Sequence, residues 1–337
     1  MPANKPHGLR VAVVGATGMV GRELLQILEK RRFPVRELLA FSSGKSQKTV
    51  RFRGKTLHAP AINEKLLASC ALVFFVSSDE ISQRLAPRLA KRGVWVIDDS
   101  AAFRLKPQVP LVIPEINAEA LRPSRKLIAG PNCTMTAIAV AGFRLHASVG
   151  VISARIASYQ SVSGAGSAAL QELLSQARAM LGGGRPKASA LPGPIAFNVL
   201  PQVGRFDRFG RSSEENKVAA ELRKIWSAPK LRVSMTAVRV PVIRGHSLAA
   251  WLNLAKPVSP AKARSILEKT PGLKFARKQY PTPLSCSGRD PVYAGRVRQG
   301  VDSKEIALWI VSDNLLKGAA LNSVQIAEEL LRRRWLA

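Results

Sequence analysis

The sequence predicts an α/β fold, in which a doubly wound parallel sheet is followed by an α+β domain with a mostly antiparallel sheet. Over the first hundred residues, short apolar runs alternate with amphipathic stretches of helical period, which is typical of βαβ units. After Pro131 the strand-like runs are longer and few helical patterns separate them. We therefore expect a first domain at 1–131, completed by a C-terminal helix at 315–337, and a second domain at 132–314.

The first domain is predicted from hydrophobic periodicity. The apolar run Leu9–Val14 predicts a strand, and the stripe of Val20, Leu24 and Leu28 predicts the helix that follows it. A continuous apolar run at 70–77 is typical of a strand buried on both faces, as in parallel sheets. The other elements expected here are strands at 35–41, 94–97 and 126–129 and a helix at 82–92.

The second domain shows a different order of predicted strands and helices. Its predicted strands lie at 154–162, 231–240, 247–255 and 305–312, after a helical pattern at 134–146. The stretch 181–194 is rich in Gly, Pro and small residues and predicts a long surface loop. A helical stripe at 316–334 ends the chain, and its basic cluster 332–334 falls where cations favour the helix dipole.

The charge of the chain is unusual for an enzyme. Its 337 residues hold 52 Lys+Arg against 22 Asp+Glu, a formal net charge of +30, which raises the possibility of a nucleic-acid-binding protein. Such a protein needs clustered basic residues with stacking aromatics, whereas aromatics are only 6% here and the basic residues are dispersed. A hydrophobic content of 46% also argues against a disordered chain.

The cysteines and the N-terminus indicate the cellular compartment. The three cysteines Cys70, Cys133 and Cys286 are widely spaced without a Cys-x-x-Cys pattern, so we expect neither a disulfide framework nor a metal site. The first seven residues have no apolar core of a signal peptide, and no apolar run approaches the roughly 20 residues of a membrane span. These features favour a cytoplasmic protein without a membrane partner.

A glycine-rich turn follows the first predicted strand. In the run 15–21 (GATGMVG), Gly15 permits a tight turn, Gly18 allows a pyrophosphate to approach the backbone, and Gly21 allows close packing of helix and strand. The helix that begins here presents free N–H groups and its positive dipole end. In an alternating chain this pattern predicts a Rossmann-type dinucleotide site.

The second predicted strand ends without the acidic residue that usually binds the ribose of NAD. It is followed by Ser42 and Ser43 in the sequence SSGKSQK, whose small hydroxyls and lysines suit a 2′-phosphate. We therefore expect NADP (NADPH) in preference to NAD. The alternative interpretation of this stretch is a solvated basic loop.

Cys133 is the candidate nucleophile. The segment 130–134 (GPNCT) joins a predicted strand to a predicted helix, and a thiol near a helix N-terminus has a lowered pKa. Asn132 is placed to donate a hydrogen bond to an oxyanion. Cys70 fits a buried structural role, and nothing around Cys286 suggests activation.

The segment 239–247 (RVPVIRGHS) carries a second candidate group. A strand that bears Arg239, then a turn, then His246 can present an anion clamp and an acid/base group to one cleft. A single histidine near a strand end is more often structural, so the pattern alone leaves both interpretations open.

Together, these motifs resemble those of the bacterial aspartate-β-semialdehyde dehydrogenase family over about 9–330. Order and spacing both agree. The matching segments are GATGMVG (15–21), SAAFRLKPQVPLVIPEIN (100–117), PNCT (131–134), YQSVSGAG (159–166), PIAFNVLP (194–201), EENK (214–217), RVPVIRGHS (239–247), YPTPL (280–284) and NLLKGAALNSVQIAE (314–328).

The resemblance implies reversible, NADPH-dependent reductive dephosphorylation of L-aspartyl-4-phosphate to L-aspartate 4-semialdehyde, within lysine, threonine and methionine biosynthesis. It implies that Cys133 forms a thioester, that Gln160 orients the substrate, and that His246 is the acid/base group. It also implies a homodimer formed through the second domain, or a homotetramer built from such dimers.

The same resemblance implies residues for substrate and cofactor. Arg239 matches the clamp for the α-carboxylate, Glu214 matches the partner of the α-amino group, and Arg104 with Lys217 match the phosphate-binding pair. The matched cofactor positions are Gly15, Thr17, Gly18, Met19, Val20, Gly21, Ser42, Ser43, Ser163, Gly164 and Asn314.

Some positions depart from the family pattern. Gly130, Met135 and Leu316 replace the usual residues, and the loop after the second strand is shortened, which bears on cofactor preference more than on the chemistry. The nearest alternative enzyme is N-acetyl-γ-glutamyl-phosphate reductase, which would not be expected to show Glu214 with Lys217 because its substrate amine is acylated. An inactive relative is disfavoured because the matched catalytic positions are all retained.

Overall fold

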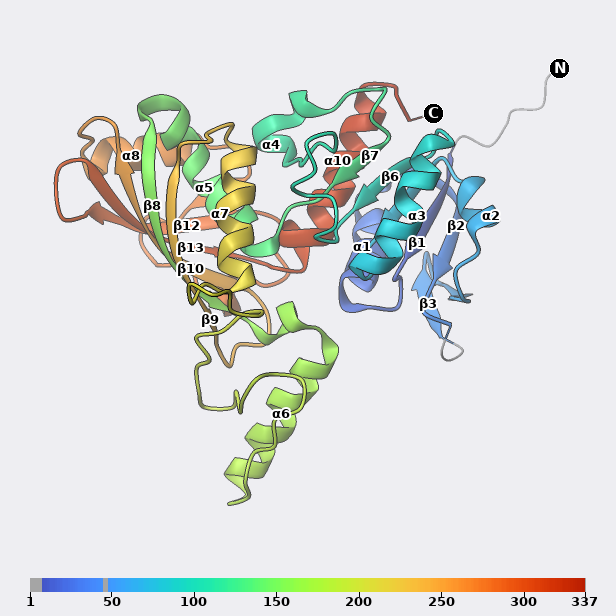
Figure 1. Ribbon diagram of the computed structural model, residues 1–337, viewed down its shortest axis with the longest axis horizontal. Helices are drawn as coiled ribbons and strands as arrows, with labels where there is room; N and C mark the ends of the chain where they lie inside the picture. The colour runs from blue at the N-terminus through green and yellow to red at the C-terminus, as the bar shows by residue number, and fades with distance from the viewer. Residues whose placement is uncertain (1–7, 45–47, 337) are drawn as a thin grey trace. The chain divides into compact units, whose positions relative to one another are not determined.

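The computed structural model describes residues 8–44 and 48–336. The chain divides into two compact units (Figure 1). One runs to Pro131 and resumes at Ala319, and the other is Asn132–Gly318. Each unit has its own sheet.

The first unit is built on a five-stranded parallel sheet, which confirms the predicted α/β fold. Its strand order is β2-β1-β5-β6-β7, so the chain moves outward in one direction from β1 to β2 and in the other from β5 to β7. The point of reversal, between β1 and β5, is where doubly wound folds bind ligands. The strands are β1 (Leu9–Val14), β2 (Val35–Phe41), β5 (Leu72–Phe75), β6 (Trp95–Asp98) and β7 (Leu127–Ala129).

The helices of this unit cover the sheet. Because crossovers are right-handed and the strand order reverses, α1 (Met19–Lys30) and α3 (Asp79–Lys91) belong to opposite faces. Helix α1 buries Leu24 and Leu28 of the predicted stripe together with Leu25 and Ile27, whereas Val20 is only partly buried. The remaining elements are α2 (Glu64–Ala68), α4 (Pro114–Asn117), the 3₁₀ turn Ala118–Ala120, and the hairpin of β3 (Thr49–Phe52) and β4 (Lys55–His58), which the sequence analysis did not predict.

The C-terminal helix α10 (Leu321–Arg332) packs in the first unit against α1, α4 and β6. The indole of Trp95 donates to the carbonyl of Trp335, and the two rings stack with centroids 6.2 Å apart. The basic residues at these helix ends also form ion pairs, since Arg31 meets Glu328 at 2.7 Å. The helix is therefore an integral part of this unit.

The second unit contains a six-stranded sheet of order β11-β12-β13-β10-β8-β9 (Figure 1). The sheet is mixed: β11–β12 and β8–β9 are parallel pairs, and the other three neighbouring pairs are antiparallel. The sequence analysis did not predict β11 and β12. The strands are β8 (Val151–Gln160), β9 (Arg232–Arg239), β10 (His246–Leu254), β11 (Leu273–Phe275), β12 (Val292–Gln299) and β13 (Glu305–Ser312).

Helix α5 (Cys133–Val149) is the core helix of the second unit. It is buried over most of its length and packs on β8, β10, β12 and β13. Its neighbours α7 (Ser213–Ile225) and α8 (Pro260–Glu268) lie beside it. Figure 1 shows α6 (Ser167–Leu181) extending beyond the sheet of its own unit. The irregular stretch 182–212 that follows includes the predicted loop 181–194, except for Leu181, which still belongs to α6.

The short helix α9 (Pro283–Cys286) and the π-helical turn Leu316–Ala320 complete the assignment. Within 8–44 and 48–336, no helix is both long enough and apolar enough to cross a bilayer. The same residues contain no cluster of three or more His, Cys, Asp or Glu side chains arranged to hold a metal ion.

Candidate active site

Cys133 is the first residue of α5. The helix begins here because the side-chain oxygen of Asn132 accepts hydrogen bonds from the N–H groups of Thr134 (2.8 Å) and Met135 (2.9 Å), which caps the first turn. The thiol is half-buried and lies at the positive end of the helix dipole, where a thiolate is stabilised.

His246 is the partner of the thiol. It opens β10, is fully buried, and places Nε2 3.4 Å from Sγ of Cys133. On the other side of the ring, Nδ1 meets the backbone N–H of Ser161 at 3.1 Å and the Ser161 hydroxyl at 3.1 Å. Burial, reinforced by the positive charge of Arg239, lowers the pKa of His246 to about 3.

Arg239 and Gln160 end two neighbouring strands at one level. β8 and β9 are parallel, and Gln160 is paired with Arg239. Because paired residues point to the same face of a sheet, these two side chains lie together at the C-terminal ends of their strands. Arg239 is 6% exposed and donates to the carbonyl of Ser161 at 2.8 Å. Burial lowers the pKa of this guanidinium, while the negative charges of Cys133 and Glu214 oppose that shift. The arginine thus places a buried positive charge near the candidate nucleophile.

Glu214 joins the same group from α7, whose start is fixed by a capping box between Ser212 and Glu215. Its carboxylate accepts from the amide of Asn132 at 3.1 and 3.0 Å and from the amide of Gln160 at 3.1 Å. Lys217 lies three residues further along the helix, on the side of Glu214. The second unit therefore brings together residues from α5, β8, α7, β9 and β10.

Asn132 has a positioning role that the sequence did not predict. Its amide nitrogen donates to the carboxylate of Glu214, and its oxygen caps α5. The residue therefore links the start of α5 to Glu214 of α7. Its role as an oxyanion donor stays a prediction.

Ser163, Gly164 and Asn314 surround the histidine. The oxygen of Asn314 accepts from the Gly245 N–H (2.9 Å) and lies 3.3 Å from the Ser163 hydroxyl, and its amide donates to that hydroxyl at 3.0 Å. These side chains form a buried network that supports the turn leading into His246. A Cβ on Gly164 would lie 3.0 Å from the Arg239 guanidinium and 3.1 Å from the His246 ring, so this glycine allows close backbone approach.

Two other site residues were not found from the sequence. The backbone N–H of Ser161 contacts the ring of His246, and Gly318 lies so close to the candidate nucleophile that a Cβ there would be 2.8 Å from Cβ of Cys133. Ser161 lies in the matched YQSVSGAG run and Gly318 in the matched NLLKGAA run, but neither sequence pattern indicates a backbone contact.

The glycine-rich turn of the first unit has the geometry predicted for it. Gly15 has φ +90°, and a Cβ there would be 2.4 Å from the carbonyl of Val76, at the point where the strand order reverses. A Cβ on Gly21 would be 2.3 Å from the carbonyl of Gly15. Gly18 caps α1 without a side-chain hydrogen bond, followed by Met19 and Val20 in its first turn. These features fit a bound diphosphate.

Arg104 is also in the first unit. Its guanidinium donates to the carbonyls of Gly130 (2.9 Å) and Asp99 (2.6 Å), so the side chain is held half-buried by the backbone.

The expected 2′-phosphate loop is partly outside the described residues, which omit 45–47. Ser42 is buried, donates to the carbonyl of Ala59 at 2.6 Å and accepts from the N–H of Gly44 at 3.2 Å. Its hydroxyl therefore holds the loop together, which corrects the expectation that it faces the cofactor. Ser43 is exposed.

The other cysteines differ from Cys133. Burial raises the pKa of the Cys70 thiol to about 11, against the positive charge of Arg10, and raises the pKa of Cys286, against hydrogen bonds with Ser285 and Thr282. Both are buried thiols, which agrees with the structural role expected for Cys70.

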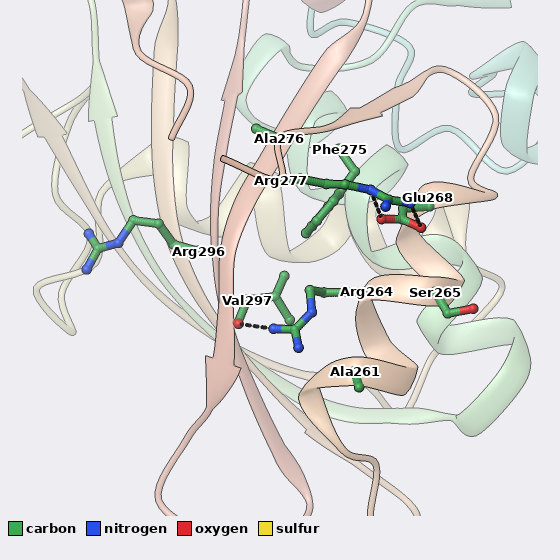
Figure 2. A pocket seen from close by; sticks show the side chains of 9 residues that line it. All are labelled: Ala261, Arg264, Ser265, Glu268, Phe275, Ala276, Arg277, Arg296 and Val297. Carbon is green, nitrogen blue, oxygen red and sulfur yellow. Dashed lines mark hydrogen bonds and ion pairs between the residues drawn. The ribbon is translucent and has the colours of Figure 1, made fainter. Parts of the chain in front are cut away.

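A separate pocket of about 460 Å³ lies between α8 and β12 (Figure 2). Arg277 pairs with Glu268 at 2.8 Å, and Arg264 donates to the carbonyl of Val297. Figure 2 shows Arg296 directed away from both arginines. The guanidinium groups do not converge, and we assign no site here.

Comparison with known proteins places the chain in a family. Residues 10–124 match "Semialdehyde dehydrogenase, NAD binding domain", and residues 143–317 match "Semialdehyde dehydrogenase, dimerisation domain". The chain is 41% identical to an aspartate-semialdehyde dehydrogenase of Synechocystis sp. over 98% of its length and 100% of that protein. It is also 41% identical to that of Aquifex aeolicus, over 96% and 98%.

The fold agrees with solved structures as well. Aspartate semialdehyde dehydrogenase II from Vibrio cholerae, complexed with ASA, has a TM-score of 0.93 and 38% identity, covering 96% of this chain and 98% of that one. With both sheets, the glycine-rich turn and the cysteine–histidine pair in place, the chain belongs to the aspartate-semialdehyde dehydrogenase family.

Proposed function

We propose that this protein catalyses the reversible, NADPH-dependent reductive dephosphorylation of L-aspartyl-4-phosphate to L-aspartate 4-semialdehyde. The observation that carries the proposal is the 3.4 Å contact between Cys133 Sγ and His246 Nε2 at the N-terminus of α5. The names of the relatives support the substrate, as does the ASA bound to the Vibrio protein.

Cys133 is the proposed nucleophile. Its thiolate attacks the acyl carbon to form a C–S bond, and the tetrahedral species breaks its C–O bond to release phosphate and leave a thioester. NADPH, when bound, would supply the hydride that reduces this thioester. The resulting thiohemiacetal breaks its C–S bond, which releases the aldehyde and restores the thiolate of Cys133.

The charges of the substrate suggest a partner for each group. Arg239 has a planar guanidinium suited to the α-carboxylate, and Glu214 offers a carboxylate to the α-ammonium group. Gln160 would orient the acyl group while it holds Glu214. We assign the phosphate to Lys217 and Arg104.

The first unit is the proposed nucleotide-binding module, and the match to an NAD binding domain supports this. Gly15, Thr17, Gly18, Met19, Val20 and Gly21 would hold the diphosphate. The preference for NADP rests on Ser43 and the lysines of its loop, since the Ser42 hydroxyl is engaged elsewhere. Gly164 would border the nicotinamide, with Ser163 and Asn314 as supporting residues.

The second unit is the proposed catalytic and dimerisation module. Its match to a dimerisation domain supports a homodimer. We place the reaction in the biosynthesis of the aspartate-derived amino acids, because its product is the semialdehyde of aspartate.

A two-substrate assay tests the proposal. With phosphate and NADP, aspartate semialdehyde should give rapid nicotinamide reduction, while N-acetylglutamate semialdehyde should give little, because its acylated amine cannot pair with Glu214. NAD in place of NADP measures the cofactor preference in the same assay. Turnover of the N-acetylated substrate alone would favour N-acetyl-γ-glutamyl-phosphate reductase and overturn the proposal.

A further inference from the structure

Asp313 is a fully buried carboxylate to which the proposed reaction assigns no role. It directly follows Ser312, the last residue of β13, which pairs with His246 at the start of β10. A buried charge is stable only where ion pairs and hydrogen bonds replace its water. The partners of Asp313 belong to two separate turns, and each turn borders one member of the Cys133–His246 pair.

The first of these turns leads into His246. Oδ2 of Asp313 forms an ion pair with Nε of Arg244 at 2.7 Å, two residues before the histidine. The residue between them, Gly245, donates its N–H to the side chain of Asn314 at 2.9 Å. The end of β13 therefore holds this turn both through a side chain and through its backbone.

The second turn packs on Cys133. Oδ1 of Asp313 accepts from the N–H groups of Leu315 (2.9 Å) and Leu316 (3.1 Å), and its carbonyl accepts from the N–H of Gly318 (3.1 Å). A Cβ on Gly318 would lie 2.8 Å from Cβ of Cys133. The same carboxylate thus holds the start of the turn that borders the candidate nucleophile.

We propose that Asp313 is a positioning residue, which fixes His246 and Cys133 relative to each other by binding Arg244 with one oxygen and the π-helical turn with the other. This proposal rests on the proposed function, which depends on the 3.4 Å contact between Cys133 Sγ and His246 Nε2. Proton exchange between these atoms requires hydrogen-bond reach, and a displacement of about 1 Å can cost on the order of 10²-fold in rate.

Asp313 should act on kcat and leave KM almost unchanged. The residues proposed to bind the substrate, Arg239, Glu214 and Gln160, come from β9, α7 and β8, which are elements other than the two turns. Loss of substrate contacts would raise KM, whereas loss of alignment between the thiol and the imidazole lowers kcat.

Asp313→Asn breaks one of the two links. The amide oxygen can still accept from the π-helical turn, whereas an NH₂ group in place of Oδ2 cannot accept from Arg244 or from the N–H of Gly288, which Oδ2 binds at 2.7 Å. We expect kcat with aspartate semialdehyde to fall at least about 10-fold while KM changes less than about 3-fold. An unchanged kcat, or a change in KM alone, would overturn the proposal.

Substitutions of Arg244 test the same link from its partly exposed partner, and they serve where Asp313→Asn does not fold. Arg244→Met should lower kcat as Asp313→Asn does, and Arg244→Lys, which keeps a cation for the ion pair, should recover part of the loss. The double variant should lose no more than Asp313→Asn alone, because both changes break one link. Losses that multiply would contradict this.

Glu305 provides the matched control at the opposite end of β13. Its carboxylate is also buried, and it is paired with Arg155 of β8. Glu305→Gln and Arg155→Met should lower the free energy of unfolding in urea, because each breaks an ion pair of a buried carboxylate, but should keep wild-type kcat. If these controls lose kcat equally, the effect is a general loss of stability and the positioning role is wrong.

The rate at which iodoacetamide alkylates Cys133, followed by peptide mass mapping, is a readout that does not depend on turnover. Loss of the Arg244 charge alone would slow the reaction of the thiolate, whereas loss of the Asp313 charge alone would accelerate it. Displacement of His246 removes a partner of the thiolate in both variants, so we expect alkylation at neutral pH to be at least about 3-fold slower in Asp313→Asn and in Arg244→Met.

Opposite changes in the two alkylation rates would show that charge alone acts, and would overturn the proposal. A wild-type enzyme that does not turn over aspartate semialdehyde would instead contradict the proposed function, and the alkylation rates would still decide whether Asp313 positions Cys133 and His246.

Discussion

The position of the missing Cβ of Gly318 lies 2.8 Å from Cβ of Cys133 and 3.1 Å from its Cα. An alanine side chain there would require the nucleophile or the π-helical turn Leu316–Ala320 to move. Because a displacement of about 1 Å at reacting groups can cost 10²-fold in rate, Gly318→Ala should lower kcat by at least about 10-fold. Steady-state kinetics with aspartate semialdehyde measure this.

Gly182→Ala is the matched control for that prediction. Gly182 has φ −86°, and the atoms nearest to a Cβ added there would lie 3.5 and 3.6 Å away, which is ordinary van der Waals contact. This variant should keep wild-type kcat. A Gly318→Ala enzyme as active as Gly182→Ala would show that close packing does not set the position of Cys133.

Asn132 should affect both stability and substrate binding. Asn132→Ala removes the cap of α5, a loss of about 1 kcal/mol, and also frees Glu214 from the Asn132 amide. Because a hydrogen bond to a charged group contributes about 1.5 kcal/mol, KM for aspartate semialdehyde should rise roughly 10-fold. Urea unfolding and steady-state kinetics measure the two effects.

Asn63 provides the comparison, because its side chain caps α2 in the same way, through bonds from Lys65 and Leu66. Asn63→Ala should lose similar stability, about 1 kcal/mol, with KM unchanged. If KM rises equally in both variants, the effect of Asn132 is a general loss of stability and its link to Glu214 is unimportant.

The buried carboxyl group of Asp99 should make the free energy of unfolding depend on pH. Burial, with a smaller contribution from Asp98, raises its pKa from 3.8 to about 6, against the Ser323 hydrogen bond and the Arg104 charge. The folded protein therefore holds this proton to higher pH than the unfolded chain does. Stability from this group is greatest below pH 3.8 and falls as pH rises to about 6. Asp99→Asn should thus gain stability relative to wild type across that window.

Glu172 should make the free energy of unfolding depend on pH in the opposite direction. Its burial tends to raise the pKa, but hydrogen bonds from the backbone of Ala190 and from Ser189 outweigh this and lower it below the ordinary 4.5. The stabilisation is present above pH 4.5 and is lost as pH falls through the lower folded value. Glu172→Gln should therefore be most destabilised near neutral pH. Urea midpoints measured against pH should diverge for the two variants, and parallel curves would contradict both assignments.

The spacing of apolar residues along the sequence predicted the main strands and helices of the first unit. β1 and β2 match their expected bounds, because each is mainly apolar and is ended by a turn signal, Gly15 after β1 and Ser42-Ser43-Gly44 after β2. In the second unit, β12 was missed because its register shifts between Gly295 and Arg298, which breaks the alternation of a regular strand. The β3–β4 hairpin was missed because its strands are only four residues long.

The site was predictable where side chains carry the chemistry. The motifs named Cys133 and His246, although their contact spans 113 residues of chain and depends on α5 packing beneath β10. Ser161 and Gly318 were missed because they act through a backbone N–H and through the absence of a Cβ. The contact of Asn132 with Glu214 was not predicted because the two residues lie 82 residues apart in sequence.

The central claim is that Cys133 carries the acyl group, and trapping that intermediate tests it most directly. The enzyme is mixed with aspartate semialdehyde and NADP without phosphate, quenched in acid, and analysed by peptide mass mapping. The account predicts an aspartyl adduct on Cys133 and none on Cys70 or Cys286, and activity that is lost in Cys133→Ala but retained in Cys286→Ala. An adduct on another residue, or turnover by Cys133→Ala, would contradict it.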